Sequence, residues 1–291
     1  MNWKGKKILV TGSEGMIGKE LVIQLKELGV DVIHYDKKFD ERLDVYNQSY
    51  LEGLLKIHNI DFVFHLFGIK GNPKMTKERP LDFMIPMLRG DLNVVEACQR
   101  CGVKRMLYTS SIAVENPESD KYPAWAKMTA ETLIEAMRIQ YPKGTKYCIV
   151  RPANVYGRFD NFDNPNAMVV TNLINKALKD NKLILDKKGC CQERDIINAK
   201  DVARGMIKAM EEMPDKPVNL CTGEATRIDR MAKIIAKELN ITIEYKDLKI
   251  TLGPNKKVMS NPYIKPEELI PLDIGLKEVI QYARNNNRTT S

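Results

Sequence analysis

Three glycines near the start of the chain have the spacing of a phosphate-binding turn. Gly12, Gly15 and Gly18 stand between an apolar run at residues 7–10 and an amphipathic helical pattern at residues 16–28. Glycines at such a junction permit a tight turn and let a ligand approach the backbone amides at the positive end of the helix. The spacing therefore predicts a binding loop for a diphosphate.

An acidic residue, Asp36, follows the next strand pattern and lies 24 residues after Gly12. An acid there accepts hydrogen bonds from the ribose hydroxyls of adenosine and repels a 2′-phosphate, which favours NAD over NADP. Lys37 and Lys38 follow at once, and they weaken this preference because a lysine can pair with that phosphate. The alternative is a glycine turn followed by a solvated acid, with no cofactor.

Short apolar runs and longer helical patterns alternate over the first 150 residues, which is typical of βαβ units and a parallel sheet. The runs are apolar throughout, as expected of strands that helices cover on both faces. The sequence predicts an α/β protein with a doubly wound parallel (Rossmann) sheet and a smaller C-terminal substrate-binding segment. The expected strands are 7–10, 31–35, 62–66, 105–110 and 147–150, and the expected helices are 16–28, 48–58, 86–101 and 124–140. Further helices are expected near 167–180, 200–212 and 227–239.

Composition and charge exclude several classes of protein. The 291 residues include 46 basic and 38 acidic side chains, for a net charge of +8, and 43% are hydrophobic. This suits a folded chain, and no apolar stretch approaches the length of a membrane span. Basic residues are interleaved with acids, which argues against nucleic acid and favours an anionic small substrate. Because the first residues lead into a strand with no apolar signal core, we expect a cytoplasmic protein.

The cysteines and histidines do not form a metal-ligand pattern. Cys98 and Cys101 have the spacing of half a metal or redox site, but they lie late in a helical pattern and no second pair follows. All three histidines lie in the first quarter of the chain. We therefore expect reduced thiols and no metal centre.

The glycine spacing resembles the extended short-chain dehydrogenase/reductase family, in particular its NAD-dependent nucleotide-sugar epimerases, dehydratases and reductases. Six later segments resemble family motifs in the same order along the chain. They are residues 43–45 (the adenine-binding acid segment), 65–68 (HLAA), 109–114 (SSxxVY), 151–157 (RPxNVYG), 194–203 (RDFxxVxDVA) and 218–224 (YNIGxGE).

The resemblance implies NAD, with NADP disfavoured, a nucleotide-sugar substrate, a role in polysaccharide biosynthesis and a homodimer formed by the helices near 86–101 and 124–140. It also implies a NAD-binding domain over 1–160, rejoined by residues of about 190–225, and a mainly substrate-binding segment over 161–291. The cofactor-binding residues that it implies are Gly12, Ser13, Gly15, Met16, Ile17, Gly18, Asp36, Asp44, Val45, Leu66, Phe67, Gly68, Lys127 and Pro152.

Catalysis in this family uses a tyrosine four residues before a lysine, together with a serine or threonine from the preceding strand end. Ser111 and Lys127 match two of these positions, but Pro123 occupies the tyrosine position and Tyr122 lies one residue earlier. On a continuous helix Tyr122 and Lys127 are about 140° apart around the axis. Because proline favours the first helical position, we expect the helix to start at Pro123 and to leave Tyr122 in a turn from which it can reach the site. The alternative is an exposed loop tyrosine, with Ser111, Lys127 or water moving the proton.

Two further positions narrow the reaction. The family's dehydratases carry an acid/base pair where this chain has Ile112 and Ala113. Residues 157–169 resemble the corresponding loop of GDP-fucose synthases, whose cysteine and histidine for 3,5-epimerisation correspond here to Ile112 and Met168. Dehydration and 3,5-epimerisation are therefore disfavoured. We expect hydride transfer at C4 of a sugar, with a GDP sugar favoured. A 4-epimerase and a non-catalytic NAD-binding partner or sensor are the alternatives.

Two more residues are expected to bind the substrate. Asn154 matches an amide on the substrate side of the site, and the alternative is a loop asparagine that caps its own backbone. Arg194 resembles the arginine that holds the substrate diphosphate, because a planar guanidinium suits phosphate oxygens. The alternative for Arg194 is a surface ion pair with Glu193 or Asp195.

Overall fold

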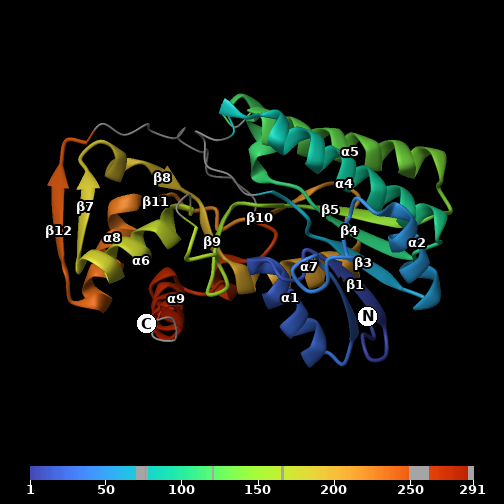
Figure 1. The fold of residues 1–291 in the computed structure, drawn as a ribbon, viewed down its shortest axis with the longest axis horizontal. Helices are drawn as coiled ribbons and strands as arrows, with labels where there is room; N and C mark the ends of the chain where they lie inside the picture. Colours follow the sequence, from blue (N-terminus) through green and yellow to red (C-terminus); the bar gives the residue numbers. More distant parts are fainter. Residues whose placement is uncertain (70–75, 77, 120, 165–166, 249–261, 288–291) are drawn as a thin grey trace.

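A six-stranded parallel sheet forms the centre of the larger part of the molecule (Figure 1). The computed structural model describes residues 1–69, 76, 78–119, 121–164, 167–248 and 262–287. Its sheet has the order β10-β5-β4-β3-β1-β2. Strand β2 lies on one side of β1 and the later strands on the other, so the strand order reverses between β1 and β3. The strands are β1 (Lys7–Thr11), β2 (Asp31–Tyr35), β3 (Phe62–His65), β4 (Arg105–Thr109), β5 (Lys146–Pro152) and β10 (Val218–Leu220).

Helices cover both faces of this sheet. On one face lie α1 (Met16–Glu27) and α7 (Ala199–Glu212), which pack against each other. On the other lie α2 (Gln48–Ile57), α4 (Leu81–Arg100) and α5 (Lys121–Gln140) (Figure 1). The predicted doubly wound α/β fold is confirmed.

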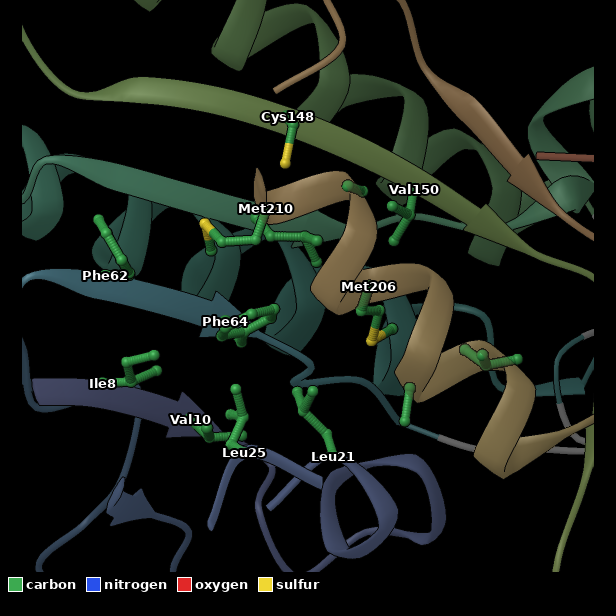
Figure 2. Close-up of a cluster of buried hydrophobic side chains, with 14 of the residues drawn as sticks. Ile8, Val10, Leu21, Leu25, Phe62, Phe64, Cys148, Val150, Met206 and Met210 are labelled. Atoms are coloured by element: carbon green, nitrogen blue, oxygen red, sulfur yellow. The ribbon is translucent and has the colours of Figure 1, made fainter. Parts of the chain in front are cut away.

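The two cores follow from the alternation of side chains along each strand. Ile8 and Val10 of β1 point toward α1 and α7, whereas Leu9 between them joins the core beneath α2, α4 and α5. Figure 2 shows Met206 and Met210 of α7 directed onto the first of these cores. Both faces are apolar, so the period-two pattern of a half-exposed strand is missing and the runs read as continuously hydrophobic.

A smaller cluster of elements lies at the other end of the molecule (Figure 1). Its core includes Leu173, Ile235 and Leu276, which come from three different helices. The helices are α6 (Val169–Asp180), α8 (Ile228–Leu239) and α9 (Leu272–Asn287). Paired short strands complete it: β7 (Lys182–Asp186) with β12 (Thr242–Lys246), β6 (Asn154–Tyr156) with β9 (Ile196–Asn198), and β8 (Glu193–Arg194) with β11 (Thr226–Arg227).

Three helices differ from the sequence prediction. Helix α4 starts at Leu81, five residues before the expected start at residue 86, and contains Pro86. Helix α5 starts at Lys121, so Tyr122 is helical and the expectation that Pro123 begins the helix is wrong. The amides of a first helical turn have no intrahelical partner, so proline is tolerated at Pro123 without marking the first position. Helix α9 was not predicted at all. None of the helices in the described ranges is long and apolar enough to cross a membrane.

Candidate functional site

The glycine loop between β1 and α1 brings backbone atoms into unusually close contact. Gly12 has a φ of +67°, and a Cβ atom on Gly18 would lie 2.1 Å from the Gly12 carbonyl oxygen. A Cβ atom on Gly15 would lie 3.1 Å from the same oxygen. Only glycine fits this arrangement, which exposes the amides at the start of α1 to a ligand.

A cleft with a volume of about 380 Å³ opens at the carboxyl ends of β1, β2, β3 and β4. This is where a doubly wound sheet binds a dinucleotide, beside the point where the strand order reverses. Most of the predicted cofactor-binding residues form its walls, namely Gly12, Gly15, Met16, Ile17, Gly18, Asp36, Asp44, Val45, Leu66, Phe67 and Gly68.

Three predicted cofactor-binding residues lie outside these walls. Ser13 is fully buried under the glycine loop, and its hydroxyl has no hydrogen-bond partner among the described residues. Pro152 ends β5 and pairs with Leu220 of β10. Lys127 is buried behind Phe67 and donates to the Phe67 carbonyl oxygen at 3.4 Å.

Asp36 has the position expected of a ribose-binding acid. Its carboxylate accepts hydrogen bonds from the backbone N–H groups of Glu14 (3.1 Å) and Lys38 (3.0 Å), which fix its orientation at the cleft wall. The side chains of Lys37 and Lys38 stand in the same wall. The acid and both lysines therefore stand together in one wall of the cleft, beside the carboxyl end of β2.

The loop after β6 forms part of the cleft wall, a feature that the sequence did not reveal. Phe159, Asp160 and Asn161 stand in the cleft wall. The preceding residue, Arg158, holds the loop to α1 by a double hydrogen bond to the buried carboxylate of Glu20 at 2.8 and 3.1 Å. A loop position carries no periodic signal, so only the fold reveals this wall.

A buried polar cluster surrounds Lys127. Asp91 of α4 is 1% exposed, and its carboxylate lies 3.6 Å from Lys127 Nζ. Tyr108 donates to Asp91 at 2.7 Å, and the Lys127 ammonium lies 4.7 Å from the centre of the Tyr108 ring. Both of these groups face Asp91 Oδ2, whereas His65 Nε2 lies 2.9 Å from Asp91 Oδ1. The sequence analysis missed Asp91, because a single acid in a helical pattern usually marks a solvated face.

The hydrogen-bond directions in this cluster follow from what each group can donate. An ionised Asp91 only accepts, so His65 donates from Nε2. Thr11 Oγ1 accepts from the Leu66 N–H at 3.1 Å, so its hydroxyl donates to His65 Nδ1 at 2.7 Å. His65 is therefore neutral, and the cluster continues as far as the residue before Gly12.

The pKa values of the cluster agree with this assignment. Burial lowers the pKa of His65 below its ordinary value despite the nearby Asp91 carboxylate. Burial and the adjacent Asp91 raise the pKa of Tyr108 well above its ordinary value. Burial opposes ionisation of Asp91, but the Lys127 ammonium and the two donors outweigh it, so its pKa is lowered. The cluster thus holds one cation and one anion.

The predicted catalytic hydroxyl of Ser111 lies just beyond β4. Ser111 caps a short 3₁₀ helix, Ile112–Glu115, by accepting the Ala113 N–H at 3.2 Å. Two nearby buried hydroxyls, those of Thr109 and Ser110, have no hydrogen-bond partner in the described part of the chain. Thr109 also stands in the cleft wall, although the sequence analysis did not single it out.

Tyr122 is half-buried in the first turn of α5. Because the helix is continuous from there to Lys127, the two residues are about 140° apart around its axis. The turn from which Tyr122 was expected to swing toward the site is therefore absent.

The two predicted substrate-binding residues differ in their contacts. Asn154 donates from its side chain to the Asp195 carbonyl oxygen at 2.9 Å, so it joins β6 to the chain before β9 rather than capping its own backbone. Arg194 donates to the Glu193 carbonyl oxygen and to Gln192, and among the described residues it forms no ion pair with a carboxylate. Burial lowers the pKa of Arg194. Its guanidinium therefore remains available to an anion.

Comparison with known proteins identifies the family. The model of the NAD-dependent epimerase/dehydratase family matches residues 8–221. The chain belongs to this family. Its cleft suits the cofactor that the family name prescribes, since the Ser13 hydroxyl lacks a partner among the described residues and the glycine loop leaves room for no side chain. The chain is therefore an NAD-dependent enzyme of the nucleotide-sugar epimerase, dehydratase and reductase group.

Relatives in this family act on different sugars. GDP-L-colitose synthase from Yersinia pseudotuberculosis is 24% identical, with 96% of this chain and 98% of that protein covered. A putative UDP-glucose 4-epimerase from Methanocaldococcus jannaschii is 26% identical, with 97% and 100% covered. The crystal structure of a UDP-glucose 4-epimerase from Thermotoga maritima with UDP-glucose has a TM-score of 0.83 at 24% identity, with 97% and 99% covered. These likenesses support the fold and the family but fix no single reaction.

Proposed function

We propose that this family member transfers a hydride at C4 of a nucleotide-activated sugar, with a GDP sugar as the favoured substrate. The observation that carries the proposal is the joint placement of the glycine-loop cleft and the buried Lys127 at the same edge of the sheet. When bound, NAD would supply the acceptor for the hydride of the sugar carbon, or the donor in its reduced form. The chain's own residues orient both molecules and move the hydroxyl proton.

The strand order supports the direction in which the cofactor lies. Asp36 follows β2 and marks the adenosine end of the cleft, on one side of the glycine loop. A dinucleotide extends across the strand ends from that side to the other half of the sheet. Thr109 at the end of β4 and Lys127 on α5 would then hold the nicotinamide half.

The proposed proton path uses Ser111 and Lys127. Ser111 would hold the reacting hydroxyl and relay its proton to water, and the Lys127 ammonium would stabilise the negative charge that develops as the proton leaves. Tyr122 remains the alternative base. To test this alternative, Tyr122→Phe would be assayed for turnover and NADH binding. A complete loss of turnover with cofactor binding intact would assign the proton to Tyr122, and unchanged turnover would remove it from the mechanism.

The substrate end of the proposal rests on Arg194. Its guanidinium is half-buried and unpaired with any carboxylate in the described ranges, which suits a diphosphate. We expect Arg194→Gln to weaken binding of GDP or UDP by at least about tenfold, the loss of one charged hydrogen bond, and to leave NADH binding unchanged. Arg227 on the paired strand is the matched control, because Asp229 already occupies its guanidinium. Equal losses in Arg194→Gln and Arg227→Gln would contradict the assignment.

The reaction is tested by incubating the purified enzyme with GDP-, UDP- and dTDP-sugars and following NADH absorbance. A dehydrogenase forms one NADH for each sugar oxidised, and a reductase consumes NADH with a keto sugar. The alternative 4-epimerase, whose reaction appears in the names of two relatives, converts sugar with only catalytic NAD. NAD binding without turnover of any sugar would indicate the non-catalytic partner or sensor.

We also propose a homodimer formed through α4 and α5. Leu81, Ile85 and Leu92 lie along one stripe of α4 and are exposed, as is Trp125 on α5. Apolar side chains at this helical spacing are typical of an interface rather than a solvated face. Light scattering after gel filtration tests the proposal, and a monomeric mass would contradict it. Ile85→Glu places a charge in this stripe and should reduce a dimeric mass to that of the monomer.

A further inference from the structure

Asp91 places a negative charge behind the cleft. Hydride and proton transfer do not themselves require this charge. Its Oδ2 atom lies 3.6 Å from Lys127 Nζ. In the part of the chain that the structure describes, no other carboxylate is within ion-pair distance of that ammonium. Since His65 and Tyr108 are neutral donors to Asp91, the whole cluster has no net charge. A lone ammonium in this place would have given the cluster a charge of +1.

This neutrality matters because the two forms of the cofactor differ in charge at the nicotinamide ring. The oxidised ring carries a positive charge, and the reduced ring carries none. An uncompensated Lys127 would repel the oxidised form and leave the reduced form unaffected. An adjacent carboxylate cancels that repulsion, and the low dielectric of a buried site strengthens the effect.

We propose that Asp91 positions Lys127 behind the cleft wall and acts as its counter-ion, and that this charge sets the relative affinity of the site for NAD⁺ and NADH. Two further contacts fix the arrangement. Lys127 donates to the carbonyl oxygen of Phe67, whose residue lines the cleft. His65 connects Asp91 to Thr11, the residue before the glycine loop. The inference rests on the proposed placement of the nicotinamide half, and not on the identity of the sugar.

The test measures the ratio of the dissociation constants of NAD⁺ and NADH by calorimetry at neutral pH. Asp91→Asn has nearly the same shape as the native residue, and His65 can change tautomer to accept from the new amide, so the hydrogen bonds persist. We expect the ratio to rise about tenfold, the effect of a unit charge over a distance on the order of 10 Å at an effective dielectric of about 20. A purely structural role would weaken both forms equally and leave the ratio unchanged.

Two further variants and a control complete the design. Lys127→Met removes the cation and should lower the ratio, while the Asp91→Asn/Lys127→Met double variant removes both charges and should restore it. The matched control is Asp201→Asn, because Asp201 on α7 is also 1% exposed but does not line the cleft. Its ratio should equal that of the native enzyme.

The outcomes separate this inference from the proposed function. If Lys127→Met changes the ratio and Asp91→Asn does not, Asp91 is not the counter-ion and the inference fails while the cofactor placement stands. If neither variant changes the ratio, the nicotinamide half does not lie beside Lys127 and both proposals fail. If Asp91→Asn does not fold, the comparison of Lys127→Met with the double variant decides, because equal ratios in those two would overturn the inference.

Discussion

Replacing Gly18 with alanine tests whether the glycine loop is held together by backbone contact. The added Cβ atom would lie 2.1 Å from the Gly12 carbonyl oxygen and 2.9 Å from two Ser13 backbone atoms. These three nearest atoms all belong to the backbone, so no flexible side chain can move to relieve the contact. The loop and the start of α1 must therefore separate by about 1 Å.

Two opposing effects give the size of the change. Overpacking against the backbone costs about 1–3 kcal/mol of unfolding free energy, and alanine returns up to about 1 kcal/mol of helix propensity. The net loss of stability is then between about 0 and 3 kcal/mol. The loss of cofactor affinity is larger, because a 1 Å shift misaligns the amides that meet the diphosphate. Two hydrogen bonds to charged oxygens are worth at least about 3 kcal/mol, which corresponds to a loss of more than about 100-fold in NADH affinity.

The measurement combines calorimetry with NADH and urea unfolding of the same variant. Gly53→Ala is the control, because Gly53 lies within α2 and no atom comes within 4 Å of its added Cβ. We expect this control to gain about 0.5–1 kcal/mol of stability and to bind NADH as the native enzyme does. If Gly18→Ala bound NADH within about threefold of the native enzyme, the diphosphate would not rest on this loop.

Three other predictions concern charges around the cleft. Arg158→Met leaves the buried Glu20 without its partner and should cost about 2 kcal/mol in urea unfolding, reduced from the usual value because Arg158 is partly exposed; a loss below about 0.5 kcal/mol would contradict this. Asp36→Ala should raise NADPH affinity relative to NADH by at least about tenfold, because Lys38 then meets the 2′-phosphate unopposed; an unchanged preference would separate Asp36 from the ribose. Since the pKa of Asp91 is lowered on folding, its stabilisation is complete above about pH 4 and is lost as pH falls through the lowered pKa. Asp91→Asn should therefore show a smaller dependence of unfolding free energy on pH below about pH 4, and an equal dependence would show that Asp91 is not ionised.

Some features of the site follow from short stretches of sequence. Gly12, Gly15 and Gly18 are adjacent along the chain, and the backbone of one turn already dictates that no side chain fits between them. Asp36 also follows from local order, because the residue after β2 must emerge at the edge where β1 ends. The alternation of strands and helices likewise predicts a doubly wound sheet from local patterns alone.

Local rules were less reliable at the ends of helices. The helix expected from residue 86 starts at Leu81, and Pro123, which was expected to begin α5, lies after its start. Pro123 lies in the first turn of α5 and removes no intrahelical hydrogen bond. Pro86 lies inside α4 and does remove one, so burial of neighbouring side chains such as Phe83 and Met87 must outweigh that loss. This is why the position of Tyr122 was not predictable from its distance to Lys127 along the chain.

The sequence by itself determined the glycine turn, the acid that follows β2 and the type of sheet, because each depends on residues close together along the chain. Only the tertiary structure brought Asp91 and His65 to Lys127, and only it placed Phe159 in the cleft wall. These residues come from separate helices, strands and loops, so their contacts depend on strand order and helix packing. The spacing of these residues along the chain predicts neither the strand order nor the helix packing.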